Sequence, residues 1–401
     1  MTRVYPFIIA SCFLLSSCYA IRAYKYRNLK LTDNVRMPHV PVSKGDNTSP
    51  FIIPADAGPY ARMKKGLDSI LTGTYTAAFL VIRNDSLIYE GYFDGFNKES
   101  QLPSFSVSKS FTAILVGIAI DEGKIASVQD PMTKYLPEFA KKDPRFSKIT
   151  IQHLLDMRGG LLFHEGDYGL KDDAIKMGFS PNITAKVRKI KIEKDPGGDM
   201  EYQSVNTQLL GMIIERATGK KISQYLQEKI WQPLGMESDA FWTTDKRKQE
   251  LVYGGMNATA RDYAKLGRLM LNNGAWNGKQ VVSTHWINAS VSSDSLDKYE
   301  GYRNQWWGVR GYKYFNDSAD AVKYKETHME GGSVRSYLDK KSVKRFYVPD
   351  TYAAYQAEGI LGQFIYINPA KNLVIVRLGH NWKNSKYPYV NGFISSLGNE
   401  L

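Results

Sequence analysis

The chain has 401 residues, of which 43% are hydrophobic and 12% are aromatic, and it carries a formal net charge of +13. This length and apolar content suffice to bury a sizeable core, in one large domain or in two closely packed ones. The basic residues are spread along the chain without a nucleic-acid motif, a zinc-ligand spacing or an aromatic–basic repeat. We therefore expect a solvated basic surface, no nucleic-acid partner and no metal.

The first eighteen residues have the features of a secretory signal. Arg3 precedes an apolar segment that is too short to span a bilayer as a mature helix, and both cysteines of the chain, Cys12 and Cys18, lie here. Leu15 to Cys18 are typical of a bacterial lipobox, which predicts a lipoprotein signal peptide over residues 1–18 and a lipid on Cys18. The alternative is an ordinary signal peptide cleaved near Ala20. The expected location is the cell envelope, with the protein facing the periplasm or the surface.

Residues 19–58 mix basic, Pro, Ser and Asn residues without a sustained period, which predicts a tether that leads into a domain over residues 59–401. A short helix is predicted over 59–71. Two strand-like runs follow over 76–93, joined at Asn84 and Asp85, a pair that tolerates the positive φ angles of a tight hairpin.

The stretch from Ser104 to Gly123 predicts a buried helix. Its polar start is followed by an almost entirely apolar run, and Gly123 is a suitable left-handed cap. Ser106 and Lys109 are three residues apart, so both lie on one helix face and the amine can reach the hydroxyl. A serine becomes a nucleophile when a base removes its proton, and a lysine can be that base only if burial and the helix N-terminus lower its pKa from ~10.4.

The alternative for this pair is a helix cap and a surface lysine. The same spacing recurs from Ser295 to Lys298, but no apolar run follows that copy. The apolar run that follows the first copy therefore favours a catalytic role for Ser106 and Lys109.

Beyond this helix the sequence predicts a helical middle and a return to strands. Apolar residues recur at helical spacing over 149–157, 207–219, 223–235 and 260–274, and Gly219 and Gly274 are expected terminators. The segment 359–379 predicts two strands around a turn at Asn368, and a final helix is predicted over 389–397. We thus expect an α/β (α+β) fold, in which an antiparallel sheet from both chain ends is flanked by helices and the middle forms a helical lobe.

Three motifs together resemble the serine β-lactamase and penicillin-binding superfamily, in its class C-like branch. Ser106 and Lys109 match the first motif. Tyr202 matches the tyrosine of a Tyr-x-Asn motif, but Ser204 stands where Asn is usual, as in 6-aminohexanoate-dimer hydrolases and carboxylesterases. Taken singly, a residue such as Tyr202 is more often a core or rim aromatic than a catalyst, and one such as Ser204 is more often part of a turn or a helix cap.

The third motif, usually Lys-Thr-Gly or a His-x-Gly variant, is best matched by Ala357, Glu358 and Gly359. The resemblance implies an oxyanion hole at the backbone N–H groups of Ser106 and Ile360, and substrate contacts at Ser204, Glu358, Gly359 and Trp307. The missing Lys and Thr disfavour a substrate carboxylate, unless Arg335 or Lys325 replaces the lysine. Trp306 and Trp307 could also be core residues, and Gly359 a strand bulge.

The resemblance implies a serine hydrolase that cleaves an ester or an amide through an acyl-enzyme on Ser106, with Lys109 and Tyr202 sharing the acid–base work and no cofactor. The expected partners are a small-molecule or short-peptide substrate and, through the lipid anchor only, a membrane. Two rivals remain open. One is a β-lactamase or DD-peptidase that acts on cell-wall peptides, and the other is a catalytically silent envelope protein that only binds in the same cleft.

Overall fold

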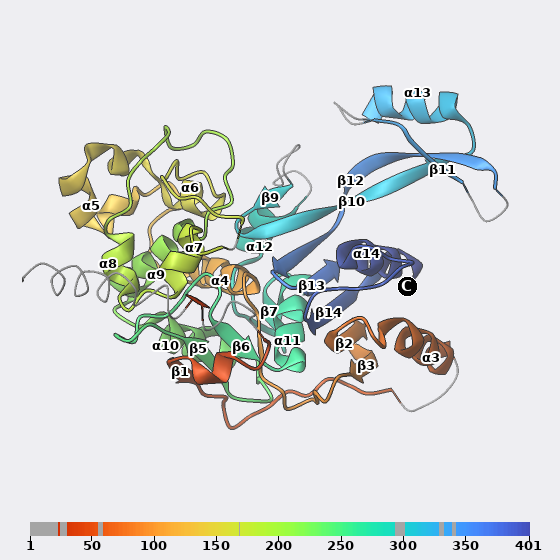
Figure 1. The fold of residues 1–401 in the computed structure, drawn as a ribbon, viewed down its shortest axis with the longest axis horizontal. Coiled ribbons are helices and arrows are strands. Elements are labelled where there is room, and N and C mark those ends of the chain that lie inside the picture. Colours follow the sequence, from red (N-terminus) through yellow and green to blue (C-terminus); the bar gives the residue numbers. More distant parts are fainter. Residues whose placement is uncertain are drawn as a thin grey trace, which may run out of the picture.

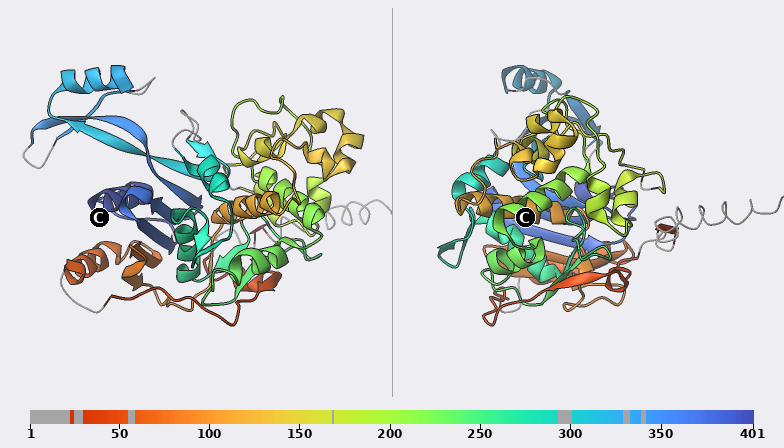
Figure 2. Two further views of the ribbon diagram at one scale, coloured as in Figure 1. Left: turned by 180° about the vertical axis from the view of Figure 1, so that it is seen from behind. Right: turned by 90° about the vertical axis from the view of Figure 1, so that its left-hand side faces the viewer.

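The computed structural model describes residues 23–24, 30–54, 59–167, 169–292, 301–328, 333–338 and 342–401. The predicted signal peptide with its two cysteines, and the Ser-x-x-Lys copy from Ser295 to Lys298, lie outside these residues. Figures 1 and 2 show a sheet between layers of helices, a helical lobe on one side and an arm that projects from the body. Among the described residues, no helix has the length and apolar character needed to cross a bilayer.

The main sheet is antiparallel and takes its strands from both ends of the chain, as the sequence predicts. Its order is β3-β2-β14-β13-β12-β10-β9, with β11 paired to β12. The bounds are β2 Thr76–Arg83, β3 Ser86–Tyr92, β9 Tyr302–Arg303, β10 Trp306–Phe315, β11 Arg335–Leu338, β12 Lys344–Gly359, β13 Gln363–Asn368 and β14 Leu373–Gly379. The predicted hairpin turn has the left-handed backbone expected of it, with φ of 49° at Asn84 and 61° at Asp85.

Two layers of helices bury the faces of this sheet. On one face, α11 (Ala260–Leu271) packs against β2, β13 and β14 within the larger hydrophobic core, which also contains α4 (Val107–Asp121). On the other face, α3 (Pro59–Leu71) and α14 (Val390–Glu400) form a second core with side chains such as Phe79 and Phe393. Because both faces are covered, the central strands are nearly continuous apolar runs rather than alternating ones.

The middle of the chain forms the predicted helical lobe around α4, whose residues from Val107 to Ala119 are all buried. Gly123 and Gly219 take the predicted left-handed conformation, with φ of 68° and 71°. A five-residue π-helix, Gln227–Trp231, continues α10. The other helices are α5 Pro137–Lys142, α6 Ile151–Leu155, α7 Asp173–Gly178, α8 Ile183–Val187, α9 Ser204–Thr218, α10 Ile222–Leu226, α12 Thr284–Val291 and α13 Ser318–His328.

A second, smaller sheet corrects the prediction for the N-terminal segment. Its order is β1-β5-β6-β4, with bounds β1 His39–Val42, β5 Ala240–Thr243, β6 Met256–Ala258 and β4 Leu102–Pro103. Val42 and Phe51 are buried in the larger core, and the Asn34 amide donates to Asn257 Oδ1 at 2.7 Å. Residues 30–54 are therefore part of the folded body and not a tether. The sequence does not predict this because the segment is attached through a few isolated apolar side chains rather than through a periodic pattern. The two-residue hairpin β7 Ala275–Trp276 and β8 Lys279–Gln280 completes the strands.

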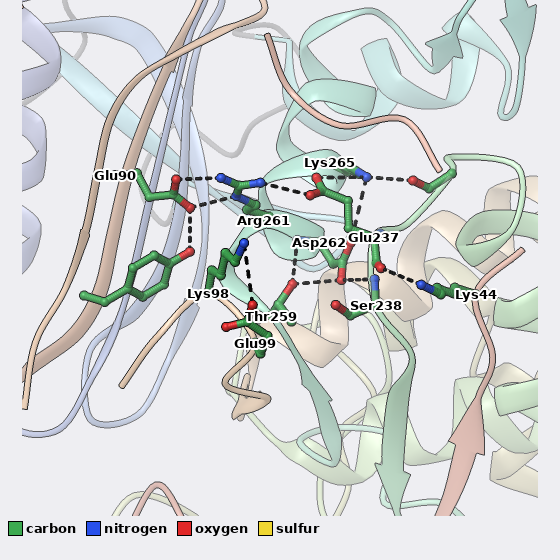
Figure 3. Close-up of polar contacts among 12 residues, drawn as sticks. Lys44, Glu90, Lys98, Glu99, Glu237, Ser238, Thr259, Arg261, Asp262 and Lys265 are labelled. Carbon is green, nitrogen blue, oxygen red and sulfur yellow. Dashed lines mark hydrogen bonds and ion pairs between the residues drawn. The ribbon is translucent and has the colours of Figure 1, made fainter. Parts of the chain in front are cut away.

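A buried polar network ties the sheet to the loop before β5 (Figure 3). Arg261 on α11 makes a bidentate pair with Glu90 on β3, at 2.7 Å for both bonds, and also reaches Glu237. Lys265, whose side chain is fully buried, donates to the Gly235 carbonyl and pairs with Glu237 at 3.3 Å. Asp262 accepts from the backbone N–H of Glu237 at 2.7 Å. Because each charge has a partner, α11 can carry these groups into the interior.

Candidate active site

A strained turn places Ser106 at the start of α4. Phe105, between β4 and the helix, has a left-handed φ of 45°, which a non-glycine residue adopts only when its surroundings impose it. Hydrogen bonds on both sides of Phe105 hold the turn, from the Ser104 N–H to the Met256 carbonyl at 2.9 Å and between the Ser104 and Ser108 hydroxyls at 2.7 Å. The serine therefore lies on a fixed support that joins the small sheet to the buried helix.

Lys109 lies one helical turn further on and contacts the serine directly. Its Nζ donates to Ser106 Oγ at 2.8 Å and to the Tyr253 carbonyl at 3.2 Å. The lysine is only 1% exposed. Burial lowers the pKa of its amine from 10.5 to about 8, although the charge of Glu165 acts in the opposite direction. The amine is thus deprotonated in a far larger fraction of molecules than a surface lysine would be.

The end of β12 approaches the backbone of the serine so closely that a side chain would not fit. A Cβ at Gly359 would lie 2.4 Å from the Ser104 carbonyl oxygen and 3.2 Å from the Ser106 nitrogen. The glycine is therefore required by close backbone approach rather than by a strand bulge. Ile360, the residue after Gly359, lines the same pocket as Ser106. Among the described residues, neither the Ser106 nor the Ile360 backbone N–H group has a hydrogen-bond acceptor. Two such donors are what an oxyanion hole needs.

Tyr202 lies beside the lysine within a group of aromatic rings. The Lys109 Nζ is 4.8 Å from the centre of the Tyr202 ring. Trp307 stacks on Tyr202, with ring centres 5.8 Å apart and planes inclined by 23°, and Tyr302 makes edge contacts with both rings. The two tryptophans differ, because Trp306 is fully buried in the larger core while Trp307 is partly exposed on the other face of β10.

Ser204 begins α9, where it holds a carboxylate that the sequence did not single out. The Ser204 hydroxyl donates to Glu165 Oε1 at 2.7 Å, and its backbone N–H donates to Glu165 Oε2 at 2.5 Å. A carboxylate at a helix N-terminus is stabilised by the helix dipole and the free N–H groups. Glu165 belongs to a loop, 161–167, without a motif, so only its three-dimensional position reveals it.

Strand alternation separates the residues of the third motif. Ala357 and Gly359 face the core that contains α4, and Ala357 is only 1% exposed. Glu358 faces the other way, beside Gln356, whose Nε2 donates to Glu358 Oε1 at 2.5 Å. Burial raises the pKa of the Glu358 carboxyl, and among the described residues no cation pairs with it. Gln356 also pairs across the strands with Trp307, so Glu358 shares a face with the aromatic group.

Neither of the cations considered as replacements for the missing lysine lies at this site. Arg335 pairs with Tyr347 near the far end of β12, and Lys325 is on α13 in the projecting arm. Tyr347 and Gly359 are twelve residue steps apart along β12, which at about 3.3 Å per step is a span of roughly 40 Å. The alternative in which one of them replaces the lysine is therefore wrong, because the residues that precede the motif form the long strand β12.

An open pocket adjoins the serine. Ser106, Ile360, Ser204 and Glu165 supply polar atoms to it, and further polar side chains on its wall are Lys30, Asn34, Thr243 and Asn257. The remaining wall is mainly apolar and includes Met37, Phe105, Ile175, Phe179, Leu251 and Tyr253. A mainly apolar wall with a few polar groups is typical of a site for a small organic molecule.

Comparison with known proteins identifies the family to which this fold belongs. A sequence model of the family described as Beta-lactamase matches residues 67–394. The chain belongs to the β-lactamase family. A 6-aminohexanoate-dimer hydrolase of Paenarthrobacter ureafaciens is 31% identical over 299 residues, covering 68% of this chain and 74% of the relative.

Solved structures agree with the β-lactamase fold. A Bacillus anthracis protein assigned as a 6-aminohexanoate-dimer hydrolase superposes with a TM-score of 0.69 at 24% identity, over 94% of both chains. A protein assigned as a β-lactamase from Bacteroides dorei DSM 17855 has a TM-score of 0.62 at 18% identity, over 86% of this chain and 99% of its own. The predicted fold class and the predicted relation to this family are confirmed.

Within the β-lactamase family fold, the structure brings Ser106, Lys109, Tyr202, Ser204, Gly359 and Ile360 to one place and sets Glu358 and Trp307 beside it. Sequence reasoning missed Glu165 and Tyr253. Tyr253 lies in the turn before β6, a position that no spacing rule connects with a serine 147 positions earlier. In the sequence, Glu165 and Tyr253 are a single acidic and a single aromatic residue without a recognisable motif around them.

Proposed function

We propose that this member of the β-lactamase family is a serine hydrolase that cleaves an ester or amide bond through an acyl-enzyme on Ser106. The observation that carries the proposal is the 2.8 Å contact between Ser106 Oγ and a fully buried Lys109 amine of lowered pKa. A buried lysine that approaches neutrality beside a hydroxyl is the arrangement that activates a serine. The relation to a 6-aminohexanoate-dimer hydrolase supports hydrolysis as the reaction class.

In the first step, neutral Lys109 takes the proton of the Ser106 hydroxyl while Oγ forms a bond to the substrate carbonyl carbon. The carbonyl oxygen becomes an anion, which the N–H groups of Ser106 and Ile360 stabilise. The proton then passes to the leaving alcohol or amine, through Lys109 and Tyr202, as the carbon–oxygen or carbon–nitrogen bond breaks. Water attacks the acyl-enzyme by the same steps and restores the free serine.

Tyr202 shares this proton transfer because its ring lies against the lysine. A tyrosine with a pKa of ~10 is a useful acid or base only if a nearby cation favours its phenolate form, and the Lys109 ammonium is the group placed to do so. Since the two groups are coupled, the pH dependence of the reaction reports the pair rather than either residue.

The substrate we propose is an uncharged or amine-bearing ester or amide rather than a β-lactam. The mainly apolar pocket accepts a small acyl group. We propose that the Glu358 carboxyl, one residue before the Gly359 that packs on the serine backbone, is the acidic group that an amine-bearing substrate approaches. A carboxylate beside Gly359 would meet Ala357 and the Glu358 carboxyl in place of the Lys and Thr of the usual third motif. This argument disfavours a β-lactamase or DD-peptidase.

Paired substrates test this selectivity. We expect a higher kcat/KM for p-nitrophenyl butyrate than for a chromogenic cephalosporin. We also expect 6-aminohexanoyl p-nitroanilide to be cleaved more efficiently than hexanoyl p-nitroanilide, which lacks the ammonium group. The variant Glu358→Gln should abolish the second preference and leave the butyrate ester unaffected. Preference of the wild-type enzyme for the cephalosporin would contradict the substrate assignment, and failure to turn over any of these compounds would support the silent binding protein.

We also propose that the protein is a lipoprotein anchored at Cys18 and located in the cell envelope. The lipobox-like sequence before Cys18 supports this location.

A further inference from the structure

The projecting arm carries an exposed cluster of tyrosines that the catalytic proposal does not use. Tyr312 and Tyr314 on β10, Tyr337 on β11 and Tyr347 on β12 are in mutual ring contact, with centres 5.4–6.1 Å apart. Tyr312 is 41% exposed, Tyr314 59% and Tyr337 40%. We call these four residues the tyrosine cluster. Figures 1 and 2 show that the arm extends away from the rest of the molecule.

Strand register places two arginines on the same face. Arg335 is paired with Tyr347, and Tyr337 with Arg345, so both arginines alternate with the tyrosines. Tyr347 in turn pairs with Tyr314 on the other side. Among the described residues of these strands, this face bears no acidic side chain. It is a positively charged, aromatic surface.

The opposite face of the arm is already covered, which makes the tyrosine face the free one. Helix α13 packs there with Ala321 and Val348 fully buried, and the rings of Phe315 and Tyr324 are 5.3 Å apart. The Tyr324 hydroxyl also donates to Asp350 at 3.0 Å. The arm is thus a supported platform, which presents its tyrosine face without the ordering penalty of a loose loop.

We propose that the tyrosine cluster, with Arg335 and Arg345, is the docking surface for an acidic partner protein. Tyrosine and arginine are the residues most enriched at the energetic centres of protein interfaces, where a ring supplies apolar area and a hydroxyl supplies a hydrogen bond. Arg335 can pair bidentately with a carboxylate of the partner, and Arg345, which donates to Asn316 Oδ1, adds positive charge beside it. The inference does not depend on the proposed hydrolase function.

Three observations favour this partner over others. The planes of three of the four contacting ring pairs are inclined by 63–83°, so the rings do not form the flat platform on which sugar rings stack. A second copy of the chain would bring together two molecules that each carry a net charge of +13 and two faces that both carry arginine. A short substrate held at Ser106 cannot reach the cluster, which lies roughly 40 Å away along β12.

Selection from a random 12-residue peptide library displayed on phage, with the purified full-length protein as bait, tests the proposal. We expect enrichment of peptides that combine Asp or Glu with an aromatic or aliphatic residue. A synthetic copy of the most enriched peptide should bind at least tenfold more weakly to the Tyr314→Ser, Tyr347→Ser double variant and to Arg335→Glu, as measured by fluorescence anisotropy. Matched controls are Tyr389→Ser and Arg36→Glu, which change an exposed tyrosine and an exposed arginine elsewhere and should bind normally.

Unchanged p-nitrophenyl ester hydrolysis and circular dichroism would show that the arm variants are folded. A selection that yields no acidic peptides, or peptides that bind the double variant as well as the wild type, would overturn the proposal. So would sedimentation of the wild type as a dimer that Tyr314→Ser dissociates, which would identify a second copy as the occupant. Binding of polygalacturonate that depends on the same tyrosines would instead identify an acidic glycan.

Discussion

Two measurements test most directly whether Lys109 is the general base. They are the pH dependence of the wild-type enzyme and the activity of Lys109→Arg. Burial lowers the pKa of the lysine from 10.5 to about 8. From these two values, about 9% of the molecules carry the neutral amine at pH 7, against about 0.03% for an unperturbed lysine. Burial therefore raises the reactive fraction about 300-fold. Since deprotonation gives the active form, kcat/KM should increase with pH, about tenfold between pH 7 and pH 9, and then level off.

Arginine keeps the positive charge but has a pKa above 12, so Lys109→Arg should remain protonated across this range. We expect a loss of about 10²–10⁴ in kcat/KM, the usual contribution of a general base. The assay is hydrolysis of p-nitrophenyl butyrate from pH 6 to pH 10, corrected for the spontaneous reaction. The matched control is Lys134→Arg, an exposed lysine on the helical lobe, which should behave as wild type. A flat wild-type profile, or near-normal turnover by Lys109→Arg, would refute the reasoning.

Four other changes test separate parts of the structure. Gly359→Ala should lower kcat by about 10²–10³ by displacing the oxyanion donors, whereas Gly392→Ala, with open space around it, should not. Glu165→Gln removes the charge that raises the pKa of Lys109, so the midpoint of the pH–rate profile should move to lower pH, and a move to higher pH would contradict the placement of Glu165. Lys265→Met leaves Glu237 and Asp262 without their buried cation, and urea unfolding should show a loss of about 3–5 kcal/mol, while a loss below about 1 kcal/mol would show that the network contributes little. Cys18→Ser should prevent incorporation of a labelled fatty acid, and continued labelling would exclude the anchor.

The sequence predicted most of the fold because its main elements carry local signals. The apolar runs of β2 and β14, the Asn84–Asp85 turn and the terminators Gly123 and Gly219 each depend on residues that are close along the chain. The small sheet was missed because its strands are two to four residues long and come from three distant segments. The arm was missed because its strands mix tyrosines with basic and other polar residues, a pattern that does not indicate burial.

The residues of the candidate active site also divide into those that the sequence indicates and those that it does not. Ser106 and Lys109 are adjacent on a helix, and Tyr202, Ser204 and Gly359 were found because together they resemble known motifs. Glu165 was not found, since nothing near it in sequence shows that a helix N-terminus 39 residues later would bind its carboxylate. The conformation of Phe105 was also not predictable, because the strain at this residue is imposed by the contacts of Ser104 with β6 and α4.

Covalent labelling of the serine tests the central claim most directly. Purified protein should react with a fluorophosphonate probe, and mass spectrometry of the digested adduct should locate the probe on Ser106. Ser106→Ala should lose the label, and Lys109→Arg should react far more slowly, while Ser110→Ala, which changes the neighbouring buried hydroxyl on the same helix, should still be labelled. Labelling that persists in Ser106→Ala, or wild-type protein that resists the probe while folded, would show that this serine is not an activated nucleophile.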